Sequence, residues 1–306
     1  MSEPTTGAET LASKSAATAA LLGVVCGLGA ALFWALGFVA TRHGLKAGFS
    51  PADLLMHRFF WSGLAFLPPV LRAGLGDLCG IGWGRGLALM VLGGPVMSII
   101  SYAGFLFVPL GHGSIIQPSC ATLGGLFLAV VLLRERISFS RFLGAVVIVA
   151  GLAVIGGESI GRIGLSGVHG DLIFVLTGFM FAGFAALVRY WRVSAFSAAA
   201  VISVLSLCLF PVYAASGELG HVVAIGLGEN ALQALGQGIL AGPAAMYLFT
   251  FSIQRLGVAR AAVFPAIVPA LTLLAGWLLL GETPTALQAA GLVTVLSGFY
   301  LAQRQR

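Results

Sequence analysis

The chain has 306 residues, of which 59% are hydrophobic and only 8% are charged, and its mean hydropathy is +1.04. A soluble domain carries roughly 25% charged residues, so this composition excludes a water-soluble globular protein. The formal net charge of +6 comes from basic residues placed singly at the ends of apolar runs. It therefore indicates determinants of membrane topology and no nucleic-acid partner.

The first part of the chain is polar, and we expect residues 1–18 to be disordered. The apolar run that follows is longer than the ~7–15 residues of a signal-peptide core, so it predicts an uncleaved first membrane helix. The 4 cysteines form no CxxC pair and no cluster with histidine. The sequence therefore predicts neither disulfides nor a metal site, and no cofactor.

Ten apolar runs follow one another along the chain. A membrane-crossing helix needs about 20 mostly apolar residues. In chain order, the runs predict helices near 20–41, 52–71, 85–109, 112–133, 139–156, 170–190, 194–215, 230–254, 257–280 and 285–302. We therefore predict an all-α membrane protein with ten transmembrane helices, in which residues 19–156 and 170–303 form two five-helix repeats joined by a linker, 157–169.

The two predicted halves share residues at a constant distance of 147 positions. The pairs at this offset are Pro118 with Pro265, Glu135 with Glu282, Gly144 with Gly291, and Gly151 with Gly298 (265 − 118, 282 − 135, 291 − 144 and 298 − 151). Upstream, Gly94–Pro95 matches Gly242–Pro243 with a slip of one residue. Internal duplication of a block of membrane helices is typical of secondary transporters.

Loop charges predict that the two repeats are inverted. Five helices is an odd number, so the second unit must enter the membrane from the opposite side. The loop 134–141 (RERISFSR) is basic, whereas its equivalent 281–288 (GETPTALQ) has no Lys or Arg. Only Arg42, Lys46, Arg58 and Arg162 fall on the side opposite the N-terminus, and the other 12 of the 16 Lys and Arg fall on the N-terminal side. That excess predicts cytoplasmic termini, and a linker 157–169 that is periplasmic.

These features resemble the drug/metabolite transporter superfamily, in its ten-helix EamA branch. The resemblance covers about residues 20–303. It is carried by LFWALGFVATRHGL (32–45), HRFFWSGLAF (57–66), the segment 118–136, FLGAVVIVAGLAVI (142–155), the segment 262–282 and AAGLVTVLSGFYLA (289–302). It implies export of amino acids, drugs or other metabolites, through a cavity lined mainly by the first, third, fourth, sixth, eighth and ninth helices.

Prolines within the predicted spans are the candidate helix breaks and gating points. A proline removes one backbone hydrogen bond and kinks a helix, and matched interruptions in two repeats point to a transport site. The alternative is that these prolines are only tolerated, because neighbouring helices satisfy the freed backbone groups. The residues are Pro95, Pro118, Pro243, Pro265 and Pro269.

Aromatic and polar residues within the spans are the candidate lining of a substrate cavity. Such a lining suits a small amphipathic solute better than an ion, although core packing would explain any single member equally well. The residues are Trp34, Phe38, Ser98, Ser101, Tyr102, Gln117, Phe179, Tyr247 and Phe264. Gln117 is the strongest member, because a buried amide in lipid needs a partner.

Charged residues and glycines complete the candidate list. His57 and Arg58 lie about one turn inside the second span, where they either couple transport or are structural. Glu135 and Glu282 fall at the ends of the fourth and ninth spans, and we expect a structural role for both. No Asp or Glu lies in the middle of a predicted span, so the sequence gives no sign of a carboxylate proton relay. The glycine pairs Gly144/Gly151 and Gly291/Gly298 predict close helix packing, either with each other or across a homodimer.

Together these observations predict a secondary transporter that exports small organic metabolites, foremost amino acids, by alternating access in a bacterial inner membrane. Its partners are then a small-molecule substrate and the lipid bilayer. Drugs, nucleobases and sugar derivatives are alternative substrates. A channel or a non-transport scaffold is the alternative from another class. An enzyme is not expected, because no convergent catalytic set is visible.

Overall fold

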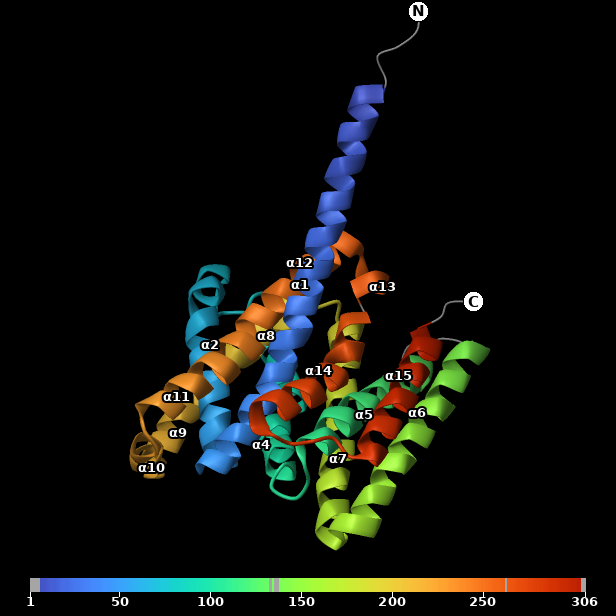
Figure 1. The fold of residues 1–306 in the computed structure, drawn as a ribbon. Helices are drawn as coiled ribbons and strands as arrows, with labels where there is room; N and C mark the ends of the chain where they lie inside the picture. Colours follow the sequence, from blue (N-terminus) through green and yellow to red (C-terminus); the bar gives the residue numbers. More distant parts are fainter. Residues whose placement is uncertain (1–5, 132–133, 135–137, 262, 304–306) are drawn as a thin grey trace, which may run out of the picture.

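The computed structural model describes the backbone of residues 6–131, 134, 138–261 and 263–303. Every regular element within these ranges is a helix (Figure 1). The elements are α1 (Thr6–Ala47), α2 (Pro51–Ala73), α3 (Trp83–Gly93), α4 (Pro95–Gly104), α5 (Leu110–Val131), α6 (Phe139–Glu158), η1 (Ser159–Ile163), α7 (Leu165–Tyr190), α8 (Ala195–Ser206), α9 (Leu209–Ala215), α10 (Glu218–Ile225), α11 (Leu227–Gln233), η2 (Ala234–Ala244), α12 (Ala245–Leu256), α13 (Val258–Ala261), α14 (Val263–Leu280) and α15 (Ala286–Gln303), where η marks a π-helix.

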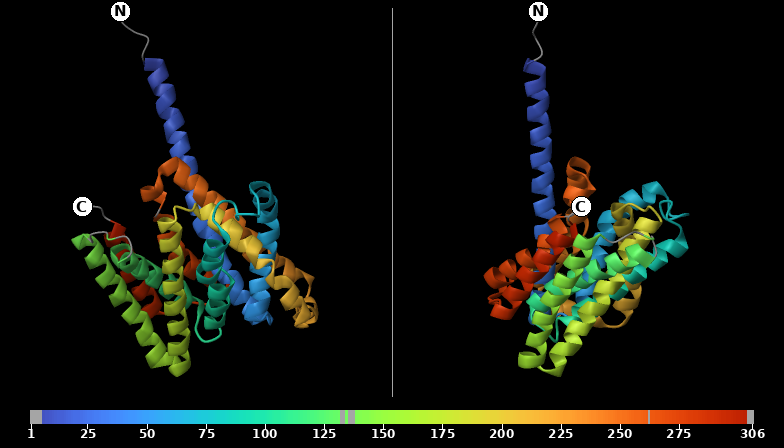
Figure 2. Two further views of the ribbon diagram at one scale, coloured as in Figure 1. Left: turned by 180° about the vertical axis from the view of Figure 1, so that it is seen from behind. Right: turned by 90° about the vertical axis from the view of Figure 1, so that its right-hand side faces the viewer.

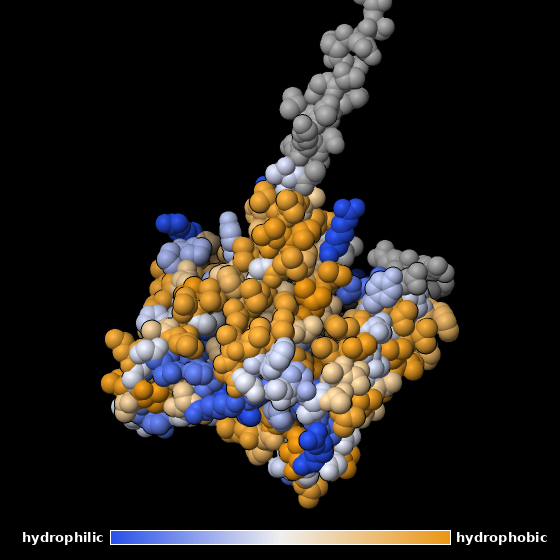
Figure 3. Space-filling view, in the orientation of Figure 1, coloured by the Kyte–Doolittle hydropathy of each residue, from blue (hydrophilic) through white to orange (hydrophobic). Residues whose placement is uncertain are grey.

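Ten stretches of these helices are long and apolar enough to cross a membrane. They are Thr18–Ala47, Pro51–Ala73, Trp83–Gly104, Leu110–Val131, Phe139–Ile163, Leu165–Tyr190, Ala195–Ala215, Leu227–Leu256, Val263–Leu280 and Ala286–Gln303. The predicted all-α membrane fold with ten spans is thus confirmed, and the protein is a multi-pass integral membrane protein. Hydrophobic side chains cover most of the face in Figure 3, as contact with lipid requires.

Three predicted boundaries differ from the structure. The third span ends at Gly104 instead of 109, because Pro109 cannot continue a helix and restricts the residue before it. Residues 6–18, predicted to be disordered, are helical as the start of α1. This stretch is rich in alanine, and extending an existing helix needs no new nucleus. The predicted linker 157–169 is also helical except at Gly164, whose φ of +85° ends η1 and starts α7.

The helix packing repeats between the two halves. The first helix of the second half, α7, packs on α3, α4 and α5 of the first half. Correspondingly, the first helix of the first half, α1, packs on η2, α12 and α14 of the second half. The pairs α2 with α8, α5 with α14 and α6 with α15 each join equivalent helices of the two halves, and the contact of α2 with η2 corresponds to that of α8 with α3. Exchanging the halves therefore leaves the pattern of contacts unchanged. Figure 2 shows α1 starting and α15 ending toward the same end of the bundle.

The four glycines predicted for close packing lie in the contact between α6 and α15. A Cβ atom built on Gly144 would lie 2.5 Å from the backbone nitrogen of Ala302, and one on Gly298 would lie 2.8 Å from that of Ile148. Gly151 and Gly291 approach the opposite helix in the same way. Of the two arrangements expected for these glycines, the structure has the one within a single chain.

Two of the five prolines coincide with a break in a helix. Pro95 begins α4 directly after Gly94, which interrupts the third span, and Pro243 follows the non-helical Gly242 within η2. Pro118 and Pro269 lie inside helices that continue through them. Pro265 lies four residues after the end of α13 at Ala261, and residue 262 between the two helices is outside the described part of the chain. It lies in the first turn of α14, where the missing N–H has no helical partner to lose.

Candidate functional site

A buried hydrogen-bond cluster joins the first and eighth spans. The amide nitrogen of Gln237, on η2, donates to the carbonyl oxygen of Gly37 at 3.0 Å and to Oγ1 of Thr41 at 2.5 Å. The hydroxyl of Tyr102, on α4, donates to Oε1 of Gln237 at 3.4 Å. Gln237, Thr41 and Tyr102 are all buried. These three side chains thus bring three spans together at one polar point.

Two buried glutamines of the eighth span, Gln233 at the end of α11 and Gln237 in η2, were not among the predicted residues. Gln233 is fully buried and donates from Nε2 to the carbonyl oxygen of Ala40 at 3.0 Å, while its Oε1 has no partner in the structure. Gln233 and Gln237 are four residues apart in the run ALQALGQGIL. A pair of amides at this spacing in an apolar stretch lies on one helical face, and that was the available signal.

A second hydrogen bond, between α4 and α5, lies beside this cluster. The hydroxyl of Ser101, adjacent to Tyr102, donates to Oε1 of Gln117 at 3.2 Å. Gln117 thus has the hydrogen-bond partner that a buried amide needs, and this partner, Ser101, is another of the predicted cavity residues. Ser98 is buried one turn earlier on α4. We call Gln237, Thr41, Tyr102, Ser101 and Gln117 the midspan polar cluster.

Aromatic residues of the predicted lining pack between the spans close to this cluster. The ring of Trp34 meets Phe249 of α12 edge-on at 5.2 Å between centroids, and Phe38 meets Phe105 at 6.1 Å. Phe264 is only 5% exposed and packs over Gly27. All three predicted residues therefore contribute to the inner surfaces of the bundle.

Phe179 and Tyr247 are not joined to the midspan polar cluster. Phe179 is 48% exposed and lies against Gly124 of α5, and Tyr247 is 63% exposed on α12. Successive residues of a helix are about 100° apart. Because Phe249 points at Trp34, Tyr247 two positions away points to the other side of α12. The rotation of α12 about its own axis depends on the helices that it packs against, so it could not be predicted from the sequence.

His57 has two partners, and both indicate a neutral imidazole with a structural role. The indole N–H of Trp61 donates to Nδ1 of His57 at 3.2 Å, so Nδ1 carries no proton. Nε2 must then hold the proton and donate it to Oδ1 of Asn230, 3.0 Å away. Both ring nitrogens thus have hydrogen-bond partners in the neutral form. The bond to Asn230 links α2 to α11.

Arg58, the next residue, has a different environment. It is half-buried and makes no ion pair with the carboxylates among the described residues. An unpaired cation at this depth is costly in lipid and typical of a functional position.

A cluster of ion pairs closes the end of the bundle at which α1 ends, here called the distal end. Oε1 of Glu282 lies 2.9 Å from Nε of Arg42 and 2.5 Å from Nζ of Lys46, and Arg42 also donates to the carbonyl oxygen of Phe105 at 2.6 Å. Oε2 of Glu282 accepts from the backbone N–H of Leu110. Glu282 therefore links α1 to the start of α5. Its counterpart Glu135 lies outside the described residues.

The charge state of Glu282 follows from these partners. Burial by itself would raise the pKa of Glu282, but the hydrogen bonds from Lys46 and Arg42 and the backbone N–H of Leu110 hold it below the ordinary glutamate value. The carboxylate is thus ionised at neutral pH. The ion pairs are lost only when the pH falls through this lowered pKa.

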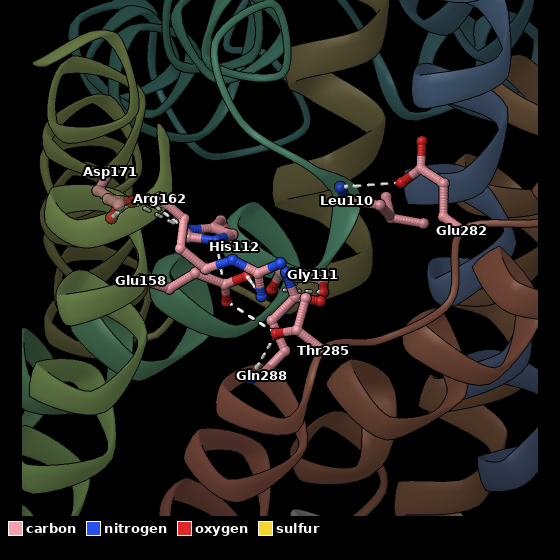
Figure 4. Close-up of polar contacts among 11 residues, drawn as sticks. Leu110, Gly111, His112, Glu158, Arg162, Asp171, Glu282, Thr285 and Gln288 are labelled. Atoms are coloured by element: carbon pink, nitrogen blue, oxygen red, sulfur yellow. Dashed lines mark hydrogen bonds and ion pairs between the residues drawn. The ribbon is translucent and has the colours of Figure 1, made fainter. Parts of the chain in front are cut away.

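A cavity of about 510 Å³ opens beside these ion pairs at the distal end. Its lining includes Arg42, Glu158, Arg162, Glu282 and Gln288. Figure 4 shows Glu282 on one side of this region and a second group of polar residues, around His112, on the other. The cavity therefore connects two charged groups that belong to different helices.

The group around His112 was also missed by the sequence analysis. Nδ1 of His112 lies 2.9 Å from Oδ1 of Asp171, and Oγ of Ser159 donates to Oδ2 of Asp171 at 2.5 Å. Nε2 of His112 faces Oε2 of Glu158 at 3.6 Å. His112 is fully buried, and Glu158 is 4% exposed. We call these four residues the His112 cluster.

Known proteins match nearly the whole chain. The model of the EamA-like transporter family matches residues 21–157 and again residues 168–303, and these two matches begin 147 residues apart (168 − 21). An uncharacterized transporter of Archaeoglobus fulgidus is 26% identical over 287 residues, which cover 90% of this chain and 96% of that protein.

A solved crystal structure of another protein has the same fold. It aligns with a TM-score of 0.61 at 19% sequence identity, over 92% of this chain and 96% of that one. The family match covers both halves, and each half aligns with the same family unit. The chain therefore belongs to the EamA-like transporter family.

Proposed function

We propose that the protein exports small organic metabolites, foremost amino acids, by alternating access. The observation that carries this proposal is the midspan polar cluster, in which amide and hydroxyl groups of Gln237, Gln117 and Tyr102 meet between aromatic walls. Hydrogen-bonding groups in an otherwise apolar site suit a small amphipathic solute. Arg58, half-buried on α2 and without an ion pair among the described residues, adds a group that attracts a carboxylate, which favours amino acids over neutral solutes.

Alternating access is supported by the positions of the helix breaks and of the ion pairs. The Gly-Pro breaks before Pro95 and before Pro243 interrupt equivalent spans of the two halves. Interrupted helices of this kind flank the binding site in many secondary transporters. The ion pairs of Glu282 with Arg42 and Lys46 hold the distal end together. Opening of that end would require these pairs to separate.

The proposal includes two inverted halves in a bacterial inner membrane, with both termini in the cytoplasm. Two observations support it. The loop 134–141 is basic, whereas its equivalent 281–288 has no Lys or Arg, and the helix contacts of one half correspond to those of the other. In this orientation the distal end faces the periplasm. Export then delivers the substrate through the cavity beside Glu282.

Uptake by reconstituted protein tests the proposal. Liposomes that contain the protein should take up labelled amino acids with saturation, and Gln117→Ala and Trp34→Ala should each lower the rate about tenfold, the equivalent of one lost hydrogen bond or ring contact of ~1.4 kcal/mol. The control is Ser119→Ala, which removes only a hydroxyl bonded to Ile115 of its own helix, and which should transport normally.

Two results would count against the proposal. Lack of saturable uptake across a broad panel of amino acids and other metabolites would exclude an exporter of this class. Normal transport by both Gln117→Ala and Trp34→Ala would instead exclude the midspan polar cluster as the substrate site. Thermal unfolding of each variant in detergent separates loss of transport from loss of folding.

A further inference from the structure

The His112 cluster holds one imidazole between two carboxylates, and one of its ring nitrogens has no hydrogen-bond partner among the described residues. Nδ1 of His112 is bonded to Asp171, and Oγ of Ser159 lies 3.3 Å from the same nitrogen. Nε2 points at Glu158, but no polar atom in the described part of the chain lies within hydrogen-bonding distance of it. A buried polar atom without a partner costs free energy, so this geometry is incomplete as it stands.

Binding of a proton would complete it. A neutral imidazole carries one N–H, and here that N–H is used at Nδ1 toward Asp171. The lone pair of Nε2 then faces the negative charge of Glu158. A proton on Nε2 would turn this contact into a charge-assisted hydrogen bond. The imidazolium would then have a carboxylate on each side.

The groups around the cluster carry more negative than positive charge. Toward His112, α6 presents Glu158, α7 presents Asp171, and η1 presents Ser159. The remaining charged group is Arg162, whose guanidinium lies 3.8 Å from Oε1 of Glu158 but is 64% exposed. Two carboxylates with little exposure thus face one cation that is mainly in water. A proton on His112 reduces this excess of buried negative charge.

The surrounding residues connect the cluster to the cavity and to both halves of the bundle. Glu158 and Arg162 line the cavity, so a proton can reach the cluster through water from the distal end. Oε2 of Glu158 also accepts from Oγ1 of Thr285, just before α15. His112 and Glu158 belong to the first half, whereas Asp171 and Thr285 belong to the second. Figure 4 shows these residues converging from four segments.

We propose that the His112 cluster is a proton-binding site that couples export of the substrate to entry of a proton. This proposal rests on the proposed function and adds its coupling ion. A proton from the periplasm binds to the lone pair of Nε2, strengthens the contacts of α5 with α6 and α7, and is released to the cytoplasm after the bundle changes conformation. The substrate moves in the opposite direction in the same cycle.

Titration of His112 tests the site without a substrate. The full-length protein, labelled with ¹⁵N-histidine and placed in lipid nanodiscs, contains 5 histidines. One set of ring signals should disappear in His112→Gln and should show protonation between pH 5 and pH 9. His169→Gln is the matched control, since His169 is exposed on α7.

Transport tests the coupling. With the amino acid that gives saturable uptake, wild-type protein should accumulate substrate against its gradient when a pH gradient is imposed. His112→Gln should accumulate at least tenfold less substrate than wild type, but it should still exchange labelled for unlabelled amino acid. His169→Gln should match wild type in both assays. A purely structural role of His112 would impair exchange together with accumulation.

Each outcome has one reading. If His112 remains neutral, or remains protonated, over the whole range from pH 5 to pH 9, the proton site is wrong. If His112 titrates but His112→Gln accumulates substrate as wild type does, the coupling is wrong. If no substrate is transported, the proposed function fails, and with it the coupling, whereas the titration still decides the proton site.

Discussion

Replacing Glu282 with glutamine should open the distal end of the bundle. The carboxylate of Glu282 binds both Arg42 and Lys46 of α1, and its side chain is only 20% exposed. Hydrogen bonds to charged groups contribute about 1.5–3 kcal/mol, and the neutral amide leaves two neighbouring cations without their counter-charge. The balance between closed and open forms should therefore shift by about tenfold or more toward the open form.

Cysteine accessibility measures this shift. Leu273 lines the distal cavity and is 7% exposed, so Leu273→Cys, in a chain without its native cysteines, reports opening. A membrane-impermeant maleimide should modify it about ten times faster when Glu282→Gln is added. The matched control is Glu229→Gln, which removes an equally short ion pair to His43 of α1, at a site with exposed fractions of 34–36%. Surface pairs of this kind contribute about 0–1 kcal/mol. Equal rates in the two variants would show that Glu282 does not close the distal end.

Gly144→Ala should destabilise the protein strongly. The added Cβ would lie 2.5 Å from the backbone nitrogen of Ala302 and 2.7 Å from the carbonyl oxygen of Gly298. Backbone atoms on both helices cannot move aside as a flexible side chain would, so α6 and α15 must separate. Overpacking costs about 1–3 kcal/mol or more, and the midpoint of thermal unfolding in detergent should fall accordingly.

Gly157→Ala provides the matched control in the same helix. No atom lies within 4 Å of a Cβ at Gly157, and its φ is not positive. Since alanine favours a helix over glycine by up to about 1 kcal/mol, this variant should be as stable as wild type or more so. Equal unfolding midpoints for Gly144→Ala and Gly157→Ala would contradict the close packing of α6 on α15.

The spans and the glycine contact could be predicted because each depends on local sequence. A run of about 20 apolar residues defines a membrane helix without reference to its neighbours. Glycines seven residues apart, such as Gly144 and Gly151, lie on one helical face whatever that face meets. Glu282 could likewise be placed, because it stands at the end of an apolar run.

The polar clusters could not be predicted, because they depend on how helices rotate and extend. Glu158 was assigned to a linker, yet α6 continues through it and turns it toward His112. Asp171 was placed at the start of a span, 59 residues from the histidine that it contacts. Gln233, the last residue of α11, and Gln237, in the π-helix η2, both face α1, and a periodicity of 3.6 residues does not describe the wider turn of a π-helix.

Equivalent prolines of the two halves lie at different places in their helices. Pro118 is well inside α5, which continues through it, whereas its counterpart Pro265 lies in the first turn of α14, where its missing N–H has no helical partner to lose. A repeat in the sequence therefore does not fix the helix boundaries on which the effect of a proline depends.

The central claim, that two inverted halves form one carrier, is tested most directly by the sidedness of two equivalent positions. Phe139 and Ala286 are 147 residues apart (286 − 139), begin α6 and α15 respectively, and are both exposed. Single cysteines at these positions should react with an impermeant maleimide from opposite sides of the membrane, position 139 from the cytoplasm and position 286 from the periplasm. Labelling of both positions from the same side would contradict the inverted repeat and the alternating access that depends on it.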